Sequence, residues 1–219
     1  MILAVAATEI EMAPFVAQLT GAAFSCRTLV TGVGPTETAL RLTRFLCRSE
    51  QQVDRVVQFG IGGAYVPADR RQQPQLLDIC LAEQEVAGDF GICLGDSMAY
   101  LDRALTGDIV YPMDPALLRQ CRAILERWGT AYHTGVFITV NGITGTSIRG
   151  KSLQSSWNGL CENMEGAAVA RVCREFDLPG VELRCISNYV EDRDPSSWRV
   201  PEACRKAADT AIKLIEGML

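Results

Sequence analysis

The sequence predicts an α/β fold, a single-domain three-layer sandwich around a central mixed, mostly parallel twisted sheet. Short apolar, often β-branched runs alternate along the chain with segments whose apolar residues follow helical spacing. Such alternation is typical of a mostly parallel sheet that helices cover on both faces. The 219 residues are 48% hydrophobic, enough for one well-filled core, and no repeat or linker divides them. We therefore expect one domain over residues 1–219.

Six segments are predicted as buried strands, because each is a short apolar run that ends near Gly, Asn, Thr or Glu. They are Ile2–Ala7, Arg27–Thr31, Arg55–Phe59, Leu77–Glu83, Gly135–Val140 and Val181–Ser187. The first run is too short to span a bilayer and meets Glu9 and Glu11 at once. We interpret it as the first strand of the sheet and not as a signal peptide.

Helical spacing predicts four helices between and after these strands. Their ranges are Pro35–Leu46, Pro115–Trp128, Glu165–Phe176 and Pro201–Met218. Proline near the first turn supports three of the starts. Another helix is expected to begin at Thr8–Glu11. The polar segment Asp69–Gln75 is predicted as a surface loop, and Asp89–Asp114, which lacks clear periodicity, as a long functional or interface loop.

Charge and cysteine usage exclude several classes of protein. The net charge is −5 and the basic residues are scattered, which argues against nucleic acid or an anionic membrane as a partner. The nine cysteines are odd in number and form no CxxC pair, so reduced thiols in a cytoplasm are the natural interpretation. The one histidine, His133, argues against a zinc site and leaves any Ser-His or Cys-His pair dependent on a single residue.

Two glycine-rich segments, Gly32–Pro35 and Gly60–Gly63, each follow a predicted strand. Glycine lets the backbone turn tightly and approach a ligand closely. Neither segment matches a dinucleotide-binding fingerprint or a P-loop, so an NAD-dependent oxidoreductase is the least favoured function. One such segment alone would be explained by helix–strand packing, but two in successive units favour a ligand crevice.

Polar groups gather at three junctions between strands and helices. Thr8–Glu11 follows the first strand, Glu165 begins an apolar helical run, and Arg184–Asn188 ends the last strand. Open α/β sheets build their sites at strand ends, so these junctions indicate an enzyme for a small polar molecule. Taken singly, either glutamate could complement a helix dipole and Arg184 could be a buried ion-pair partner. Purely structural roles for all of them together are the weaker interpretation.

These motifs resemble the purine nucleosidase branch of the nucleoside phosphorylase superfamily, above all its methylthioadenosine/adenosylhomocysteine nucleosidases and futalosine hydrolases. The resemblance covers nearly the whole chain and rests on the order and spacing of five segments. They are Ala7–Glu11, Gly32–Gly34, Gly60–Gly63, Asn163–Glu165 and Arg184–Asn188. It implies a nucleoside phosphorylase-like fold, hydrolysis of the N-glycosidic bond of a purine nucleoside, and no metal or organic cofactor.

The resemblance also implies roles for individual residues. Glu11 matches the carboxylate that activates water, Arg184 an arginine beside that water, and Asn188 a purine-facing catalytic residue. The substrate-binding positions that it implies are Gly62, Gly63, Ile143, Thr144, Asn163, Met164, Glu165 and Ser187. Among these, Glu165 matches the carboxylate that binds the ribose hydroxyls, and Met164 the residue beneath the sugar.

The chemistry of the reaction calls for the same residue types. Cleavage of an N-glycosidic bond develops positive charge on the ribosyl ring and negative charge on the departing purine. A catalyst needs anionic groups near the sugar, donors near the base, and a general base for water. Hydrolysis is favoured over phosphorolysis, because the acidic turn Thr8–Glu11 would repel phosphate.

Asn188 favours one substrate within this branch, since adenine-specific relatives carry Asp at that position. An amide NH2 suits the two acceptors N7 and O6 of a 6-oxopurine such as hypoxanthine, the base of futalosine. A mismatched buried polar pair costs about 1–3 kcal/mol. Futalosine also carries a carboxylate on its 5′ aromatic tail, which an arginine could bind bidentately. Arg193 is the first candidate for that contact and Arg199 the second.

The expected activity is therefore hydrolysis of futalosine to hypoxanthine and dehypoxanthine futalosine, for menaquinone biosynthesis. The alternatives are a methylthioadenosine/adenosylhomocysteine nucleosidase, a purine nucleoside phosphorylase, and a nucleoside-binding or sensing domain without turnover. The resemblance further implies a homo-oligomer built from dimers, in which the loop Asp89–Asp114 covers a neighbour's site.

Overall fold

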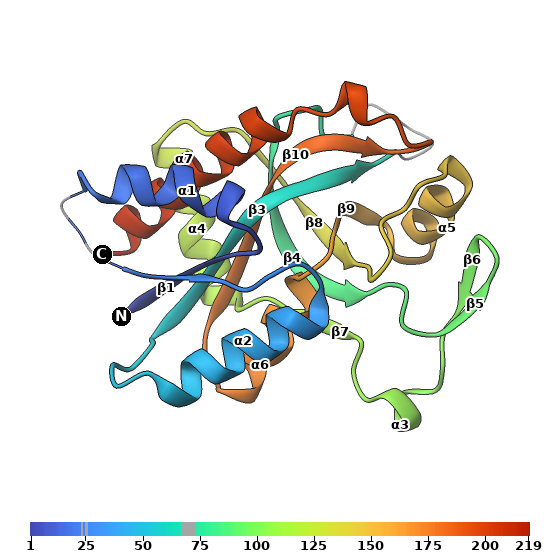
Figure 1. The fold of residues 1–219 in the computed structure, drawn as a ribbon, viewed down its shortest axis with the longest axis horizontal. Helices are drawn as coiled ribbons and strands as arrows, with labels where there is room; N and C mark the ends of the chain where they lie inside the picture. Colours follow the sequence, from blue (N-terminus) through green and yellow to red (C-terminus); the bar gives the residue numbers. More distant parts are fainter. Residues whose placement is uncertain (23, 25, 67–72) are drawn as a thin grey trace.

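A computed structural model describes residues 1–22, 24, 26–66 and 73–219. Its centre is an eight-stranded mixed sheet with helices on both faces (Figure 1). The strands are β1 (Ile2–Ala6), β2 (Arg27–Val30), β3 (Arg55–Tyr65), β4 (Ile79–Ala87), β7 (Val110–Pro112), β8 (Tyr132–Thr139), β9 (Gly159–Asn163) and β10 (Gly180–Val190). Parallel pairs outnumber antiparallel ones. The predicted α/β fold with a mixed, mostly parallel sheet is confirmed.

Strand β3 organises the sheet. One of its edges pairs with β10 in parallel from Val56 to Tyr65. Its other edge pairs with β1 near its start and with β9 near its end. Because β10 also pairs with β4, β4 with β8, and β8 with β9, these five strands close into a ring. Strands β1 and β2 extend the sheet beyond this ring, and β7 joins β4.

The helices lie in layers on the sheet. They are α1 (Glu9–Leu19), α2 (Pro35–Arg48), α3 (Arg103–Thr106), α4 (Pro115–Arg127), α5 (Ser147–Trp157), α6 (Gly166–Glu175) and α7 (Val200–Met218). Figure 1 shows α1, α4 and α7 together on one side of β1 and β3, and α2 with α6 on the other. Within the described part of the chain, no helix combines the length and apolar character needed to cross a membrane.

Strand β1 shows why the layers form. All five of its residues are buried, and alternate side chains point to opposite faces of a strand. Ile2, Ala4 and Ala6 pack into the core beneath α1, α4 and α7. Leu3 and Val5 pack into the second core beneath α2 and α6. A continuous apolar run therefore needs helices on both faces.

The six predicted strands are present as β1, β2, β3, β4, β8 and β10, and the predicted helices as α1, α2, α4, α6 and α7. The prediction of an irregular loop over Asp89–Asp114 was wrong in part. This segment contains the hairpin of β5 (Ile92–Leu94) and β6 (Ser97–Ala99), which Gly95 turns at φ 67°, and also α3 and β7. Residues 69–72 of the predicted surface loop lie outside the described residues, and Gln73 and Pro74 are buried.

Candidate active site

A cavity of about 270 Å³ opens where the ends of β9 and β10 meet the starts of α1 and α7. Of the twelve site residues expected from the sequence, ten line it: Glu11, Gly62, Gly63, Ile143, Asn163, Met164, Glu165, Arg184, Ser187 and Asn188. Thr144 and Arg193 are not among the lining residues. Segments far apart in the sequence therefore meet in one cavity.

Glu11 is held by its own helix and by β3. Thr8 is the N-cap of α1, and its hydroxyl accepts a hydrogen bond from the Glu11 N–H. In return, Glu11 Oε2 accepts from the Thr8 N–H at 3.0 Å and the Thr8 hydroxyl at 2.8 Å. Oε1 accepts from the Ile61 N–H at 3.0 Å. The buried carboxylate thus has a fixed direction, and a Cβ at Gly60 would lie only 2.5 Å from Oε1.

Arg184 is the cation at the centre of the site and is 2% exposed. Its Nη2 donates to Glu165 Oε2 at 3.2 Å, its Nε to Glu182 Oε1 at 2.7 Å, and its Nη1 to the Ile61 carbonyl at 3.1 Å. Burial alone would lower the pKa of Arg184, but the carboxylates of Glu182, Glu165 and Glu11 outweigh burial and raise it. Arg184 therefore stays charged, and the ion pair with Glu165 considered from the sequence is present.

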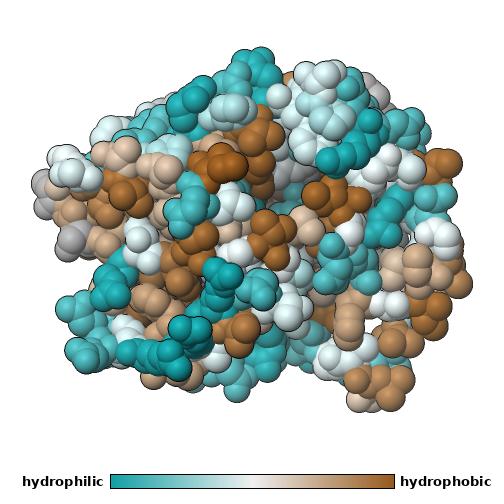
Figure 2. Space-filling view, viewed as in Figure 1, coloured by the Kyte–Doolittle hydropathy of each residue, from teal (hydrophilic) through white to brown (hydrophobic). Residues whose placement is uncertain are grey.

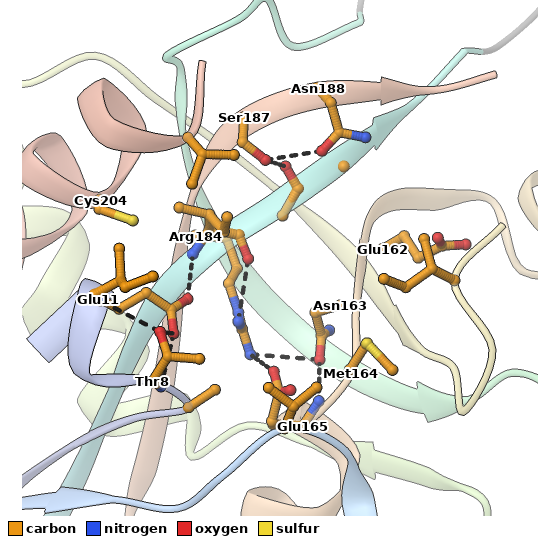
Figure 3. Close-up of a pocket in the computed structure, with 18 of the residues that line it drawn as sticks. Thr8, Glu11, Glu162, Asn163, Met164, Glu165, Arg184, Ser187, Asn188 and Cys204 are labelled. Carbon is orange, nitrogen blue, oxygen red and sulfur yellow. Dashed lines mark hydrogen bonds and ion pairs between the residues drawn. The ribbon is translucent and has the colours of Figure 1, made fainter. Parts of the chain in front are cut away.

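Glu165 lies at the start of α6 with its carboxylate turned into the cavity. Its Oε1 accepts from the N–H of Gly34, the N-cap residue of α2, which has φ 93°. Burial raises the pKa of Glu165, whereas Arg184 and the Gly34 N–H act in the opposite direction. Figure 3 shows Glu11 beside the Arg184 side chain, Glu165 at its tip, and Asn188 apart from both.

A β-bulge directs the end of β10 toward the cavity. Ile186 pairs with Gly62 and Asn188 with Gly63, so Ser187 is the extra residue. The Ser187 hydroxyl donates to Asn188 Oδ1 at 2.8 Å, and Asn188 Nδ2 donates to the Tyr189 carbonyl at 3.1 Å. These two bonds fix the amide orientation and leave one Nδ2 hydrogen for a ligand.

Glu162, which the sequence analysis did not single out, also lines the cavity. Its Oε1 accepts from the Thr144 N–H at 3.0 Å, and its Oε2 accepts from the Thr144 hydroxyl at 2.5 Å and from the Tyr65 hydroxyl at 2.9 Å. Burial raises the pKa of Glu162. Thr144 therefore uses its backbone and side-chain donors to hold the Glu162 carboxylate. Glu165, three residues after Glu162, was identified from the start of the helical run and from the resemblance of the segment Asn163–Glu165.

Apolar side chains form the rim of the cavity. Ile10, Val33 and Ile143 line it and are 67%, 53% and 50% exposed. Figure 2 shows apolar residues across the middle of this face of the molecule, with hydrophilic residues above and below. Trp198, also missed from the sequence, lines the cavity, and the Arg193 guanidinium lies 4.6 Å from the centre of its ring. Arg193 is exposed beside the cavity and not inside it.

The arrangement combines two carboxylates and a guanidinium at one end with a side-chain amide at the other. Carboxylates can stabilise a developing cation and take a proton from water. The amide can donate to an electron-rich ring atom. The apolar rim suits a less polar part of the same ligand. The cavity is therefore equipped to hold a polar molecule and to hydrolyse it.

Known proteins resemble this chain over most of its length. The family model described as "Phosphorylase superfamily" matches residues 19–219. The chain is 31% identical to the futalosine hydrolase of Thermus thermophilus over 191 residues, which cover 85% of this chain and 80% of that protein. It is 25% identical to the 5′-methylthioadenosine/S-adenosylhomocysteine nucleosidase of Marinomonas sp., over 87% of this chain and 79% of that one.

Among solved structures, the futalosine hydrolase of Helicobacter pylori shares the fold with a TM-score of 0.82 at 18% identity, covering 98% of this chain and 97% of that one. From the match of its family model and its identity to the Thermus protein, this chain belongs to the phosphorylase superfamily, in the family of the futalosine hydrolases.

Proposed function

We propose that this protein hydrolyses the N-glycosidic bond of futalosine and releases hypoxanthine and dehypoxanthine futalosine for menaquinone biosynthesis. The observation that carries the proposal is that the cavity bears a side-chain amide, that of Asn188, opposite the carboxylates. The names of the Thermus and Streptomyces relatives, both futalosine hydrolases 31% identical to this chain, support it.

In this proposal, Glu11 takes a proton from the attacking water, because its fixed carboxylate can accept one. Glu165 binds the ribose hydroxyls and stabilises the positive charge that develops on the sugar. Arg184 holds Glu165 in place and borders the water. Asn188 donates its remaining N–H to the departing base, with Ser187 fixing the amide. Gly62, Gly63, Ile143, Asn163 and Met164 would contact the nucleoside from the cavity wall.

Phosphate dependence tests the reaction type. We expect purified protein to release hypoxanthine from futalosine in phosphate-free buffer, with no rate increase when phosphate is added. The reason is that the nucleophile would bind beside the Glu11 carboxylate, whose negative charge disfavours an anion there. Release of hypoxanthine only after phosphate is added would identify a phosphorylase and contradict this assignment.

Arg193 would bind the carboxylate of the futalosine tail. It lies over the Trp198 ring at the cavity edge, where a tail leaving the 5′ position would emerge. We expect Arg193→Ala to raise the KM for futalosine about 10- to 100-fold with kcat unchanged, because a hydrogen-bonded charge contributes about 1.5–3 kcal/mol. Inosine, which has no tail, serves as the control substrate and should show an unchanged KM. An unchanged KM for futalosine would exclude Arg193, leaving Arg199, which pairs with Glu202 at 2.9 Å.

We also propose that residues 1–219 act as one nucleosidase domain in the cytoplasm and assemble as a homo-oligomer of dimers. The β5–β6 region supports an interface, because Phe90, Ile92 and Leu94 are 49%, 50% and 58% exposed. Sedimentation velocity measures the assembly, and a monomer at every concentration would contradict it.

A further inference from the structure

Two carboxyl groups lie behind the cavity wall and have no part in the reaction proposed above. Glu85 on β4 is 0% exposed and Glu182 on β10 is 1% exposed. A buried charge is costly unless it is paired and hydrogen-bonded. Their partners therefore show in which form each carboxyl is held.

The hydrogen bonds of the two groups differ. Glu182 Oε1 accepts from Arg184 Nε at 2.7 Å, but Glu182 Oε2 is buried and finds no hydrogen-bond partner among the described residues. Glu85 Oε1 accepts from Asn163 Nδ2 at 2.5 Å, and Glu85 Oε2 from the Thr139 hydroxyl at 2.7 Å. Glu182 therefore pairs with the cation, whereas Glu85 has only neutral partners.

The unpartnered oxygen of Glu182 lies beside Glu85. A Cβ built on Gly166 would collide with both Glu85 Oε1 and Glu182 Oε2. The two oxygens therefore lie close together, next to the Gly166 Cα. Two ionised carboxylates this close to each other in the protein interior repel strongly. One proton shared between them removes that repulsion. A proton on Glu85 Oε1 would also supply the donor that Glu182 Oε2 lacks.

We propose that Glu85 is held as the neutral acid, donates a hydrogen bond from its carboxyl O–H to Glu182 Oε2, and forms with Glu182 a positioning pair for Arg184 and Asn163. Glu182 holds the Arg184 guanidinium through Nε, and Glu85 holds the Asn163 amide through Nδ2. Asn163 Oδ1 in turn accepts from the Glu165 N–H at 2.9 Å. The pair thus sets the two side chains that position Glu165. Only the role of the positioned Glu165 in catalysis rests on the proposed function.

The surroundings favour the neutral acid. Burial raises the pKa of Glu85, the neighbouring Glu182 carboxylate raises it further, and the Thr139 hydroxyl and Arg184 oppose the shift. The titratable and charged groups around Glu85 are Glu182 and Arg184 on β10 and Cys161 on β9, and Glu165 at the start of α6 lies on the far side of Arg184 and Glu182. Arg184 is the one cation of this set, and Glu182 and Glu165 already pair with it.

The dependence of stability on pH tests the proposal without any substrate. A Glu85 that stays protonated in the folded state, but ionises when unfolded, makes the protein less stable as pH rises between those two pKa values. From about pH 5, above the usual pKa of an unfolded Glu, up to the raised folded-state pKa of Glu85, the unfolding constant of the wild type should therefore rise about tenfold per pH unit relative to Glu85→Gln. Parallel curves for the two proteins would show an ionised Glu85 and overturn the proposal. Glu83→Gln on the same strand, where Glu83 pairs with Arg122, is the matched control and should follow the wild type.

Activity and infrared spectra give independent readouts. In the proposal, Glu85 Oε1 both donates to Glu182 and accepts from Asn163. In Glu85→Gln the amide nitrogen can only donate and the amide oxygen can only accept, so one of these hydrogen bonds is lost and kcat is expected to fall about tenfold. Glu182→Gln removes the anion from Arg184 and should lower kcat about 10- to 100-fold. If Glu85→Gln does not fold, Glu85→Asp is used in its place. The infrared band of a protonated carboxyl C=O, recorded at neutral pH, should then lie at a different position in Glu85→Asp than in the wild type. An unshifted band would contradict the proposal, whichever nucleoside proves to be the substrate.

Discussion

Glu11→Gln is expected to lower kcat for nucleoside hydrolysis by about 10²–10⁴-fold with little change in KM. The amide has the shape of the carboxylate but cannot take a proton from water. It can still accept one of the hydrogen bonds that now reach Glu11 from Thr8 and Ile61, so the side chain should stay in its place. Single-turnover release of the free base, followed by chromatography, measures the chemical step directly.

Glu9→Gln is the matched control for this variant, because Glu9 lies in the same first turn of α1 but is exposed. It removes the same charge near the same helix end without touching the cavity. Thermal unfolding of both variants shows whether the helix persists. If Glu11→Gln keeps kcat within tenfold of the wild type, Glu11 is a helix cap only, and the water must be activated by another group.

Asn188→Asp is expected to shift the substrate preference from hypoxanthine nucleosides toward adenine nucleosides. The ratio of kcat/KM for futalosine over methylthioadenosine should fall about 10- to 100-fold, since a mismatched buried hydrogen bond costs about 1–3 kcal/mol. The Asn188 amide has one N–H left after its bonds to Ser187 and Tyr189, and O6 of hypoxanthine has no proton to offer. A carboxyl at this position suits a base that carries an amino group.

Asn158→Asp makes the same chemical change away from the cavity, at the left-handed residue that ends α5. Because Asp tolerates that conformation, this control should leave the ratio unchanged. An Asn188→Asp ratio equal to that of the wild type would show that the base is selected elsewhere in the cavity, with Glu162 the first residue to test.

The helices and strands that could be predicted are those whose sequences show an unbroken apolar run, a helical spacing of apolar residues or a clear starting residue. Strand β1 is buried on both faces and reads as an unbroken apolar run, and α2 begins with a proline after Gly34. Helix α5 could not be found in this way, because the few apolar residues of its sequence SIRGKSLQSSW do not gather on one face of the helix, as those of α2 do. Its ends are defined instead by Thr146 at the N-cap and Asn158 at the C-cap.

The residues at and behind the cavity also differ in whether the sequence predicts them. Glu11 and Glu165 follow the ends of β1 and β9, and Asn188 follows the predicted strand Val181–Ser187, so topology brings them together and their order along the chain predicts a common site. Glu85 and Glu182 lie within strands, where their neighbours depend on register. Glu85 reaches Asn163 across 78 positions only because β4, β8 and β9 lie side by side. No local pattern in the sequence marks such a contact.

The most direct test of the account is the rate of base release from three nucleosides by the same wild-type protein in phosphate-free buffer. With futalosine, methylthioadenosine and inosine supplied separately, we predict that kcat/KM is highest for futalosine and that hypoxanthine is the base released. Inosine should be cleaved more slowly, because it has the same base but lacks the tail that Trp198 and Arg193 would contact. Faster release of adenine from methylthioadenosine would contradict the substrate assignment and the role of Asn188.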